Sequence, residues 1–386
     1  MPVTMPEAFQ LPALKIPILV QLGLTYRCNL KCSHCYALYR RDRNEFTLDE
    51  LRNLAKELYA AGSAAVVYSH GENMIRSDFH QAAQIFRDLD FYQTLMLNGF
   101  YVRKADDARR LAAAGINRTM ISVDSVDPAV HDKVRGKAGA FGRALNAVEL
   151  LLASDVETVG FSCTIDRHNY DAIPEIVELA VRNGAQAISF MQNRYNLRDI
   201  FDRSMLATYE RVCRQIYELM LSYRGQVDIY THDPFMLTLL DDRLTDEQER
   251  ADFIGANVCN VATSMVSIDP TGNITGCNFI PEIIGNVRDE PFADIWQRLI
   301  DRYSDDVEPP TGACTGCGVL SKCMGGCKAY HYVDKYDERC GETRFGDSAP
   351  HGIPAAQIDA IIPDRAPGVF LGMPSLGTRL AQQVGS

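Results

Sequence analysis

The chain has 386 residues, of which 46% are hydrophobic and 23% are charged, so it contains enough apolar material to fold around a core. Its formal net charge of -11 argues against a nucleic-acid partner, because phosphate binding requires a basic surface that this composition does not favour. The sequence contains neither an apolar run of membrane-spanning length nor the pattern of a signal peptide, so we expect a cytoplasmic protein without membrane contact.

Strand-like and helix-like patterns alternate along the first half of the chain. Short apolar runs predict strands at residues 18–24, 64–68, 93–97, 118–123, 158–166 and 187–192. Apolar residues at helical spacing predict helices at residues 47–61, 79–88, 105–114, 141–152 and 173–183. Strands that alternate with helices indicate a parallel sheet with helices outside it, and right-handed connections then give a doubly wound sheet or a full or partial barrel.

The pattern changes after residue 235. The segment 241–252 is charged and reads as helix or loop, and the cysteine-rich stretch 259–340 has few long periodic elements. Metal clusters are therefore expected to take the place of a hydrophobic core in that stretch. We predict three regions, which are a barrel domain at 17–235, an auxiliary domain at 236–345 and a C-terminal tail at 346–386 that wraps the surface or is partly disordered.

Three cysteines, Cys28, Cys32 and Cys35, share one loop directly after the first predicted strand. The twelve cysteines of a cytoplasmic chain are expected to bind metals or to act in catalysis rather than to form disulfides. Soft thiolates select zinc or iron–sulfur clusters, and a structural zinc ion is usually closed by four ligands. Three thiolates would hold an iron–sulfur cubane with one open iron, and the alternative is a zinc site completed by His34 or His70.

The C-x3-C-x2-C spacing of this loop resembles the signature of the radical S-adenosylmethionine (SAM) superfamily. Further segments follow in the motif order of that family, and these are Tyr68-Ser-His-Gly-Glu-Asn73, Leu97-Asn-Gly99, Ile121-Ser-Val-Asp124 and His131-Asp-Lys-Val-Arg135. The resemblance covers roughly residues 20–190. It implies an α/β fold with a partial (β/α)6 TIM-like barrel, and a reaction in which SAM is cleaved to a 5′-deoxyadenosyl radical that abstracts a hydrogen atom from the substrate.

The resemblance also implies roles for individual residues. Cys28, Cys32 and Cys35 would hold a 4Fe–4S cluster whose open iron takes the amino and carboxylate groups of SAM. His70 and Asn73 depart from the motif, since the family usually has glycine and proline there, and His70 is expected to be packed or solvated, with substrate contact as the alternative. The implied SAM contacts are His34 at the adenine, Gly71 and Glu72 at the methionyl ammonium, and Asn98, Ser122 and Asp124 at the ribose or methionyl part.

Seven cysteines in the second half of the chain have a spacing that resembles the SPASM domain, an extension of some radical SAM enzymes that carries auxiliary clusters. The resemblance implies one cluster held by Cys314, Cys317, Cys323 and Cys340, and an inner cluster held by Cys259, Cys277 and Cys327. With the first loop, this predicts three 4Fe–4S clusters. The inner cluster is expected to have an open iron or a fourth ligand of another kind. A zinc-ribbon-like site is the alternative, and it would leave three cysteines unexplained.

Two cysteines lie outside both groups and are candidate hydrogen donors to a substrate radical. Side chains alternate along a strand, so Cys163 shares a face with Phe161 and Ile165, and we expect this face to meet the outer helices rather than SAM. Cys213 lies in an apolar stripe at helical spacing, and it would reach the site only if its helix lines the cavity. Both thiols are therefore expected to be core residues. Hydrogen return from a thiol would give epimerisation, whereas electron loss would give oxidation or a crosslink.

The same resemblance limits the substrate, since SPASM relatives act mainly on peptides and in a minority of cases on sugars and aminocyclitols. Only 27 residues precede Cys28, too few for a leader-binding domain, so we expect epimerisation or oxidation of a carbon centre in a small hydroxylated natural product. The alternatives are a maturase that modifies or crosslinks a ribosomally made peptide, and a non-catalytic iron–sulfur or zinc protein. A one-electron reductant such as flavodoxin or ferredoxin is the expected protein partner.

Overall fold

The computed structural model describes residues 16–37, 42–193, 206–239, 243–304 and 326–329. Its parallel strands are β1 Leu19–Gly23, β2 Ala65–Ser69, β3 Tyr92–Leu97, β4 Ile116–Ser122, β5 Thr158–Ile165, β6 Ala187–Gln192, β7 Asp228–Thr231 and β8 Met265–Ile268. Two short strands, β9 Asn273–Thr275 and β10 Gly285–Asn286, pair in antiparallel fashion beyond β8. Within the described ranges these strands form one ten-stranded sheet in the order β10-β9-β8-β1-β2-β3-β4-β5-β6-β7.

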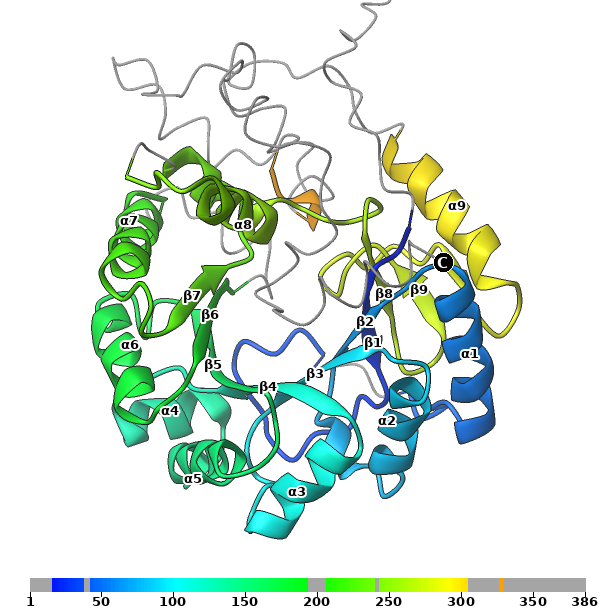
Figure 1. The fold of residues 1–386 in the computed structure, drawn as a ribbon, viewed down its shortest axis with the longest axis horizontal. Helices are drawn as coiled ribbons and strands as arrows, with labels where there is room; N and C mark the ends of the chain where they lie inside the picture. Colours follow the sequence, from blue (N-terminus) through cyan, green and yellow to red (C-terminus); the bar gives the residue numbers. More distant parts are fainter. Residues whose placement is uncertain (1–15, 38–41, 194–205, 240–242, 305–325, 330–386) are drawn as a thin grey trace, which may run out of the picture.

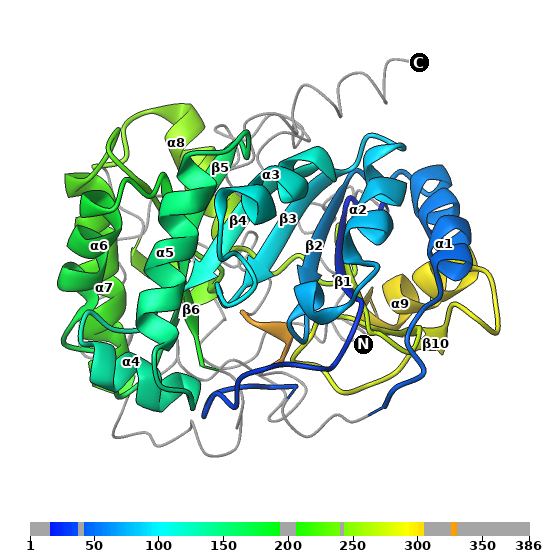
Figure 2. The ribbon, with the colours of Figure 1, turned by 90° about the horizontal axis from the view of Figure 1, so that it is seen from below.

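Helices connect the consecutive parallel strands and lie on the outer side of the curved sheet (Figure 1). They are α1 Leu48–Ala60, α2 Phe79–Arg87, α3 Ala105–Ala113, α4 Pro128–Arg135, α5 Ala140–Leu152, α6 Ile173–Arg182 and α7 Leu206–Ser222. Figure 2 shows α2, α3 and α5 lying across the outer face of the strands. Among the described residues, no helix is both long enough and apolar enough to cross a membrane.

The predicted α/β fold with a partial barrel is confirmed by this alternation of parallel strands and helices. The six predicted strands correspond to β1 to β6, and they pair with one another in sequence order. β7 adds a further parallel strand beside β6, and β8 pairs in parallel with β1 at the opposite side. The sheet is therefore wider than the prediction, because strands that follow the barrel motifs extend it at both edges.

The outer face of the sheet packs against the helices and forms the hydrophobic core. α1 shows how the sequence builds this layer, because Thr47 and Glu50 form a capping box at its start. Its apolar face, Leu51, Leu54 and Leu58, is buried in the core shared with the strands. The inner face differs in character, and the side chains that line it include Thr94, Met96, Met120, Ser122, Ser162, Thr164, Ser189 and Met191.

The described part of the cysteine-rich region has a conventional hydrophobic core, so the expectation that metal clusters would replace one was wrong for this part. Helix α9 Phe292–Ser304 buries Phe292, Ile295 and Leu299 completely, in the same hydrophobic cluster as the barrel helices. Its apolar residues recur at helical spacing, which is the pattern of an amphipathic helix. Together with the pairing of β8 to β1, this packing makes the region continuous with the barrel.

Candidate active site between the two cysteine groups

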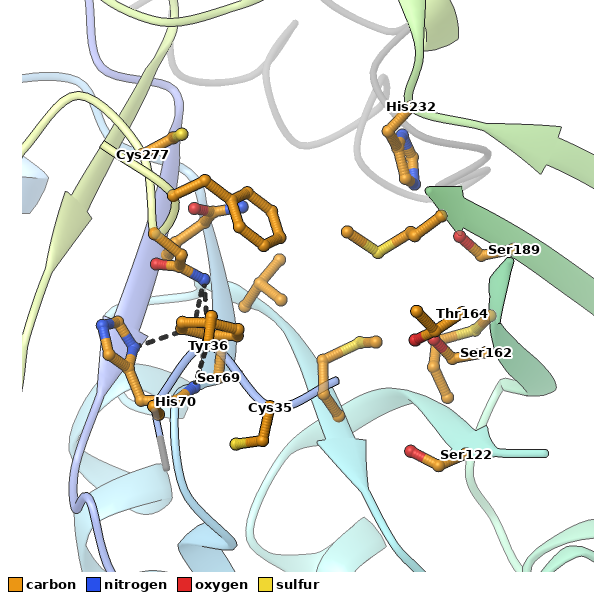
Figure 3. Close-up of a pocket in the computed structure, with 18 of the residues that line it drawn as sticks. Cys35, Tyr36, Ser69, His70, Ser122, Ser162, Thr164, Ser189, His232 and Cys277 are labelled. Atoms are coloured by element: carbon orange, nitrogen blue, oxygen red, sulfur yellow. Dashed lines mark hydrogen bonds between the residues drawn. The ribbon is translucent and has the colours of Figure 1, made fainter. Parts of the chain in front are cut away.

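A cavity of about 630 Å³ lies on the inner side of the sheet and extends to the carboxyl ends of the strands. Figure 3 shows Ser122, Ser162 and Ser189 on one wall, facing Tyr36 and His70 on the other. Cysteines of both groups line this cavity, and they are Cys28, Cys32, Cys35, Cys259, Cys277 and Cys327. A ligand bound in the cavity would therefore lie between the two cysteine groups.

The charged side chains of the cavity are mostly basic. Among the described residues that line it, Glu72 is the one carboxylate, and the basic residues are Arg27, Lys31, Arg43, Arg118 and Arg135. Side chains of one sign around a concave site raise the local concentration of ligands of the opposite sign. Arg27 and Arg135 are paired with Glu45 and Asp124, so the preference of the cavity for ligands with negative groups depends mainly on Lys31, Arg43 and Arg118.

Hydrogen-bond donors lie beside the sulfur atoms of Cys28 and Cys32 in the first loop. Leu30 N lies 3.4 Å and Asn98 Nδ2 lies 3.8 Å from Cys28 Sγ, and Arg135 Nη1 lies 3.9 Å from Cys32 Sγ. Burial is the main cause that raises the pKa of the Cys28 thiol to about 12, so metal binding must displace its proton. Thiols with N–H and guanidinium donors beside them fit the ligands of an iron–sulfur cluster, whose potential such contacts tune.

The turn after β2 holds the first part of the cysteine loop through backbone hydrogen bonds. Gly71 N donates to Thr25 O, and Glu72 N donates to Arg27 O, both at 2.9 Å. A Cβ atom at Gly71 would lie 2.4 Å from Arg27 O and 2.6 Å from Thr25 O, so a larger residue would push the two segments apart. Gly71 was predicted as a point of close approach to SAM. In the structure, its lack of a side chain lets the turn after β2 pack against the backbone of the cysteine loop.

The carboxyl end of α4 holds the second part of the loop. The motif segment 131–135 forms the last turns of this helix, whose C-cap is Gly136 with a φ of 66°. Ser33 N donates to Val134 O at 2.9 Å, so the cysteine loop satisfies a carbonyl that has no partner inside the helix. The helix end therefore fixes the loop that presents the three thiols.

Glu72 combines burial with an unsatisfied oxygen atom. The side chain lines the cavity, only 3% of it is exposed, and Oε2 accepts a hydrogen bond from Asn98 N at 2.8 Å. Oε1 has no hydrogen-bond partner within the described part of the chain. Burial, opposed in part by backbone N–H donors, raises the pKa of this carboxyl to about 7. A buried carboxylate with one free oxygen fits an ammonium ligand, such as the methionyl ammonium that the resemblance predicts.

We expect Glu72→Gln to change the pH dependence of stability in protein prepared without iron and SAM. The unfolded carboxyl loses its proton near 4.5, while the folded one keeps it up to a pKa of about 7, so the folded state binds more protons in between. Stability of the wild type should therefore fall by up to about 3 kcal/mol as pH rises through this window. Urea unfolding at pH 5 and pH 8 measures the change, and identical pH dependence of both proteins would contradict it.

Asp124 and Arg135 form a buried ion pair beside the first loop. Arg135 Nε lies 2.6 Å from Asp124 Oδ2, and Asp124 Oδ1 accepts from Thr164 N at 3.0 Å. Asp124 is 2% exposed and does not line the cavity, whereas Arg135 does. In the structure this carboxylate faces Arg135 rather than the cavity, and the predicted contact of Asp124 with SAM stays a prediction. Arg135 was missed as a site residue because its contact with Cys32 joins residues that lie 103 positions apart in the sequence.

Three other residues that were predicted to contact SAM line the cavity. His34, Asn98 and Ser122 all line the cavity, and Asn98 Nδ2 also donates to Asn29 Oδ1 at 2.9 Å. Burial lowers the pKa of His34, so its ring is neutral at neutral pH, and Nδ1 has no hydrogen-bond partner among the described residues. A neutral ring at the cavity suits stacking against a base, and the contacts with SAM themselves stay predictions.

His70 has a backbone conformation that normally selects glycine, with a φ of 74°. Its ring has space because Gly23 lacks a side chain, and a Cβ atom there would lie 2.7 Å from His70 Nδ1. The ring meets those of Tyr26 and Tyr36 edge-on, at centroid distances of 5.7 and 5.8 Å. His70 is thus a packed residue that also lines the cavity, and its contact with a substrate stays a prediction.

One hydrogen-bonded contact joins the two cysteine loops (Figure 3). Tyr36 Oη accepts from His70 N at 2.9 Å and from Asn278 Nδ2 at 3.1 Å. Tyr36 directly follows Cys35, and Asn278 directly follows Cys277. The spacing of the two loops is therefore fixed by side chains adjacent to predicted metal ligands.

Tyr36→Phe is expected to lower the free energy of unfolding by about 1–3 kcal/mol, because two N–H donors lose their acceptor. The matched control is Tyr59→Phe on α1, where the side chain is 46% exposed and the change should cost little. Urea unfolding of both variants measures the difference. Equal stability of the two variants would show that the contact between the loops contributes nothing.

Three of the seven cysteines in the second group are described, and all three line the cavity, namely Cys259, Cys277 and Cys327. Tyr303 on α9 interacts electrostatically with Cys277 and Cys259, which places both thiols near one ring, and burial raises the pKa of Tyr303. The structure thus brings together the set predicted to hold the inner auxiliary cluster. The other four cysteines lie outside the described residues, and they are Cys314, Cys317, Cys323 and Cys340.

Cys163 and Cys213 lie in the hydrophobic core between the sheet and the helices, with exposed fractions of 0% and 1%. Neither lines the cavity, whereas Ser162 and Thr164, on the opposite face of β5, do. This is the side-chain alternation that the sequence predicts for the strand. In this placement neither thiol reaches a radical in the cavity, so the candidate role of hydrogen donor finds no support in the geometry.

Two family models match the chain. The model of the radical SAM superfamily matches residues 22–180, and the model of the SPASM iron–sulfur cluster-binding domain matches residues 259–318. The first match contains the loop of Cys28, Cys32 and Cys35, and the second begins at Cys259.

Individual relatives cover most of the chain. The AdoMet-dependent heme synthase of Methanosarcina barkeri is 28% identical, over 82% of this chain and 93% of the relative. The mycofactocin maturase MftC of Mycolicibacterium smegmatis is 29% identical, over 85% of this chain and 84% of the relative. SuiB of Streptococcus suis, in a crystal structure with the precursor peptide SuiA, shares the fold with a TM-score of 0.69 and 18% identity, over 85% of this chain and 77% of SuiB.

Proposed function

Because the chain belongs to the radical SAM superfamily and carries a SPASM domain, we propose that it is a maturase that modifies a ribosomally made peptide. The observation that carries the proposal is that one cavity is lined by cysteines of both groups, since a substrate within it would lie between the two loops that are proposed to bind clusters. The similarity to a mycofactocin maturase over most of the chain supports a peptide substrate. The expected sugar or aminocyclitol substrate gains no such support, so the peptide alternative replaces it.

The residues present fit the cofactors of the family. Cys28, Cys32 and Cys35 would hold a 4Fe–4S cluster, which supplies the electron that cleaves SAM to methionine and a 5′-deoxyadenosyl radical able to take a hydrogen atom from the substrate. Glu72 would bind the methionyl ammonium, and Arg135 supports Cys32 from outside the loop. Two auxiliary clusters on the seven later cysteines complete the proposed set of three.

The position of the remaining thiols favours an oxidative outcome. Epimerisation requires a hydrogen donor within reach of the substrate radical, and Cys163 and Cys213 lie in the core instead. The proposed reaction therefore oxidises or crosslinks a carbon centre of the peptide. Each SAM cleavage consumes one electron, so the enzyme needs a one-electron reductant such as flavodoxin or ferredoxin.

The heme synthase relatives give a second candidate function, in which the substrate is a tetrapyrrole. The basic side chains of the cavity favour it as well, because a tetrapyrrole with acid side chains carries negative charge. The peptide and tetrapyrrole readings share the same radical initiation and differ in what fills the cavity.

The test is a turnover experiment with both substrate classes. The protein is reconstituted anaerobically and mixed with SAM and dithionite. It is then given either candidate precursor peptides, sought among the short reading frames near its gene, or a heme-precursor tetrapyrrole. We expect 5′-deoxyadenosine together with a mass change of the peptide, measured by chromatography and mass spectrometry. A change in the tetrapyrrole absorption spectrum with an unaltered peptide would overturn the maturase proposal in favour of the second candidate.

A further inference from the structure

The cavity contains a buried cation that the reaction at the cysteines does not use. Arg118 on β4 is 2% exposed and lines the cavity. Its Nε donates to Met120 Sδ at 3.3 Å, and its Nη2 contacts the hydroxyl of Tyr230 on β7. The guanidinium carbon lies 4.9 Å from the centroid of the Tyr230 ring. The side chain thus extends from β4 across the inner side of the sheet to β7.

Two hydroxyl groups on strands next to Arg118 and Tyr230 have no hydrogen-bond partner among the described residues. Thr94 pairs with Arg118 in the register of β3 and β4, and Ser189 pairs with Tyr230 in the register of β6 and β7. Thr94 and Ser189 both line the cavity and are 4% exposed, and neither hydroxyl has a hydrogen-bond partner in the described part of the chain. Figure 3 shows the Ser189 hydroxyl directed into the cavity.

This polar region lies deeper than the predicted SAM site. Arg118 precedes Ser122 by four positions on β4, which corresponds to about 13 Å along a strand toward its amino end. Ser122 and the cysteine loop lie at the carboxyl ends of the strands, where the cofactors are expected. A substrate could therefore place one end at Arg118 and present another part to the radical above it.

The chemistry of the region selects an anion with several acceptor atoms. A buried guanidinium is costly unless acceptors surround it, and Asp228 and Tyr92 already interact with Arg118 electrostatically. On the cavity side, the hydroxyls of Thr94 and Ser189 are donors that burial leaves unsatisfied. A carboxylate would accept from the guanidinium and from both hydroxyls, which matches the planar geometry that arginine recognises best.

We propose that Thr94, Arg118, Ser189 and Tyr230 form a subsite at the inner end of the cavity that binds a carboxylate of the substrate. The proposal rests on the proposed function in that it specifies the substrate class of the same cavity. A peptide provides such a group at its C-terminus or on an aspartate or glutamate side chain. The subsite would hold that group and so set which carbon atom faces the radical.

The first test measures binding with small probes and needs no turnover. The probes are 3-phenylpropanoate and its neutral isostere 3-phenylpropanamide, added to reconstituted enzyme with saturating SAM so that the predicted cofactor site is filled. We expect the wild type to bind the acid roughly tenfold or more tightly than the amide in calorimetric titration, because a charge-assisted contact is lost with the amide. Equal binding of the two probes would overturn the proposal.

Variants assign the preference to the subsite. Arg118→Met should remove the preference for the acid, and Arg118→Lys should retain part of it as a point charge. The double variant Thr94→Val with Ser189→Ala keeps every charge, so it tests the subsite even if Arg118→Met fails to fold, and it should weaken acid binding several-fold. Arg109→Met is the matched control, since its side chain is 63% exposed on α3, and it should bind like the wild type. An unchanged acid preference in the double variant and in Arg118→Met would make Arg118 a structural residue of the barrel.

A second experiment separates the sources of the carboxylate and the two proposals. The peptide is compared with its C-terminal amide and with versions in which aspartate or glutamate is replaced by asparagine or glutamine. One altered peptide should have a higher KM than the original peptide with the wild-type enzyme but not with Arg118→Met, and the carboxylate that it lacks is the bound group. If no altered peptide has a higher KM with the wild type, the subsite is contradicted. Failure of the enzyme to modify any peptide would instead remove the maturase proposal, while the probe binding above would still support the carboxylate subsite.

Discussion

Replacing Cys35 with alanine is expected to abolish 5′-deoxyadenosine formation and to lower bound iron from about twelve to about eight atoms per chain. Cys35 lines the cavity on the same loop as Cys28 and Cys32, and the other three cysteines that line the cavity belong to the second group. Two remaining thiolates are too few for the loop to keep its cluster. Without the cluster, no electron is supplied for the cleavage of SAM. Iron analysis and chromatography of the reaction mixture with dithionite measure both effects.

Cys163→Ala and Cys213→Ala are the controls for this experiment. Both remove a thiol from the core, away from the cavity, so both variants should keep the full iron content and cleave SAM at the wild-type rate. If Cys35→Ala retained all of its iron and its activity, the first loop would not be the SAM-cleaving centre. If Cys163→Ala stopped peptide turnover while SAM cleavage continued, the candidate role of this thiol as hydrogen donor would be restored.

The barrel was predictable from the sequence because its signal is local. Each strand is a short apolar run and each helix an apolar stripe, so periodicity alone fixed β1 to β6 to within a few residues. β7 was missed because it has four residues, Asp228–Thr231, too few to show a period. α9 was missed for another reason, since its helical spacing is present in the sequence but the surrounding cysteines drew the interpretation toward metal clusters alone.

The site was predictable only as far as neighbours in sequence define it. The cysteine loops and Glu72 follow from the resemblance of local motifs to the family, and the inward face of β5 follows from the alternation of side chains along a strand. The contact of Tyr36 with Asn278 joins residues 242 positions apart, and it depends on β8 pairing with β1, which no local pattern reveals. Arg118 and Arg135 were passed over for the same reason, because their partners lie on other strands or loops.

Replacing Arg135 with methionine is expected to lower the free energy of unfolding by about 3–5 kcal/mol, the largest effect on stability that we predict. The substitution keeps much of the side-chain volume but leaves Asp124, which is 2% exposed, without its ion-pair partner. It also removes the guanidinium donor at Cys32 Sγ. Urea unfolding at pH 7 measures the loss, and Arg109→Met on the surface should cost less than about 0.5 kcal/mol.

The pH dependence identifies the cause of this loss. Burial raises the pKa of Asp124, but the charge of Arg135 and the neighbouring donors outweigh burial and hold this pKa below its ordinary value. The stabilisation from the pair is therefore present above the unfolded pKa, near 4, and is lost as pH falls through the folded one. The difference in free energy of unfolding between the wild type and Arg135→Met should become smaller from pH 7 toward pH 4, because protonation neutralises the unpaired carboxyl of Asp124 in the variant.

The double variant Asp124→Asn with Arg135→Met completes the argument, since it removes both charges at once. Breaking a buried pair is costly because one charge stays unpaired, whereas replacing both partners is far less costly. We therefore expect the double variant to recover a large part of the stability that Arg135→Met loses. Additive losses from Asp124→Asn and Arg135→Met would show that the two side chains act independently, and that Arg135 stabilises the cysteine loop through its contact with Cys32 rather than through Asp124.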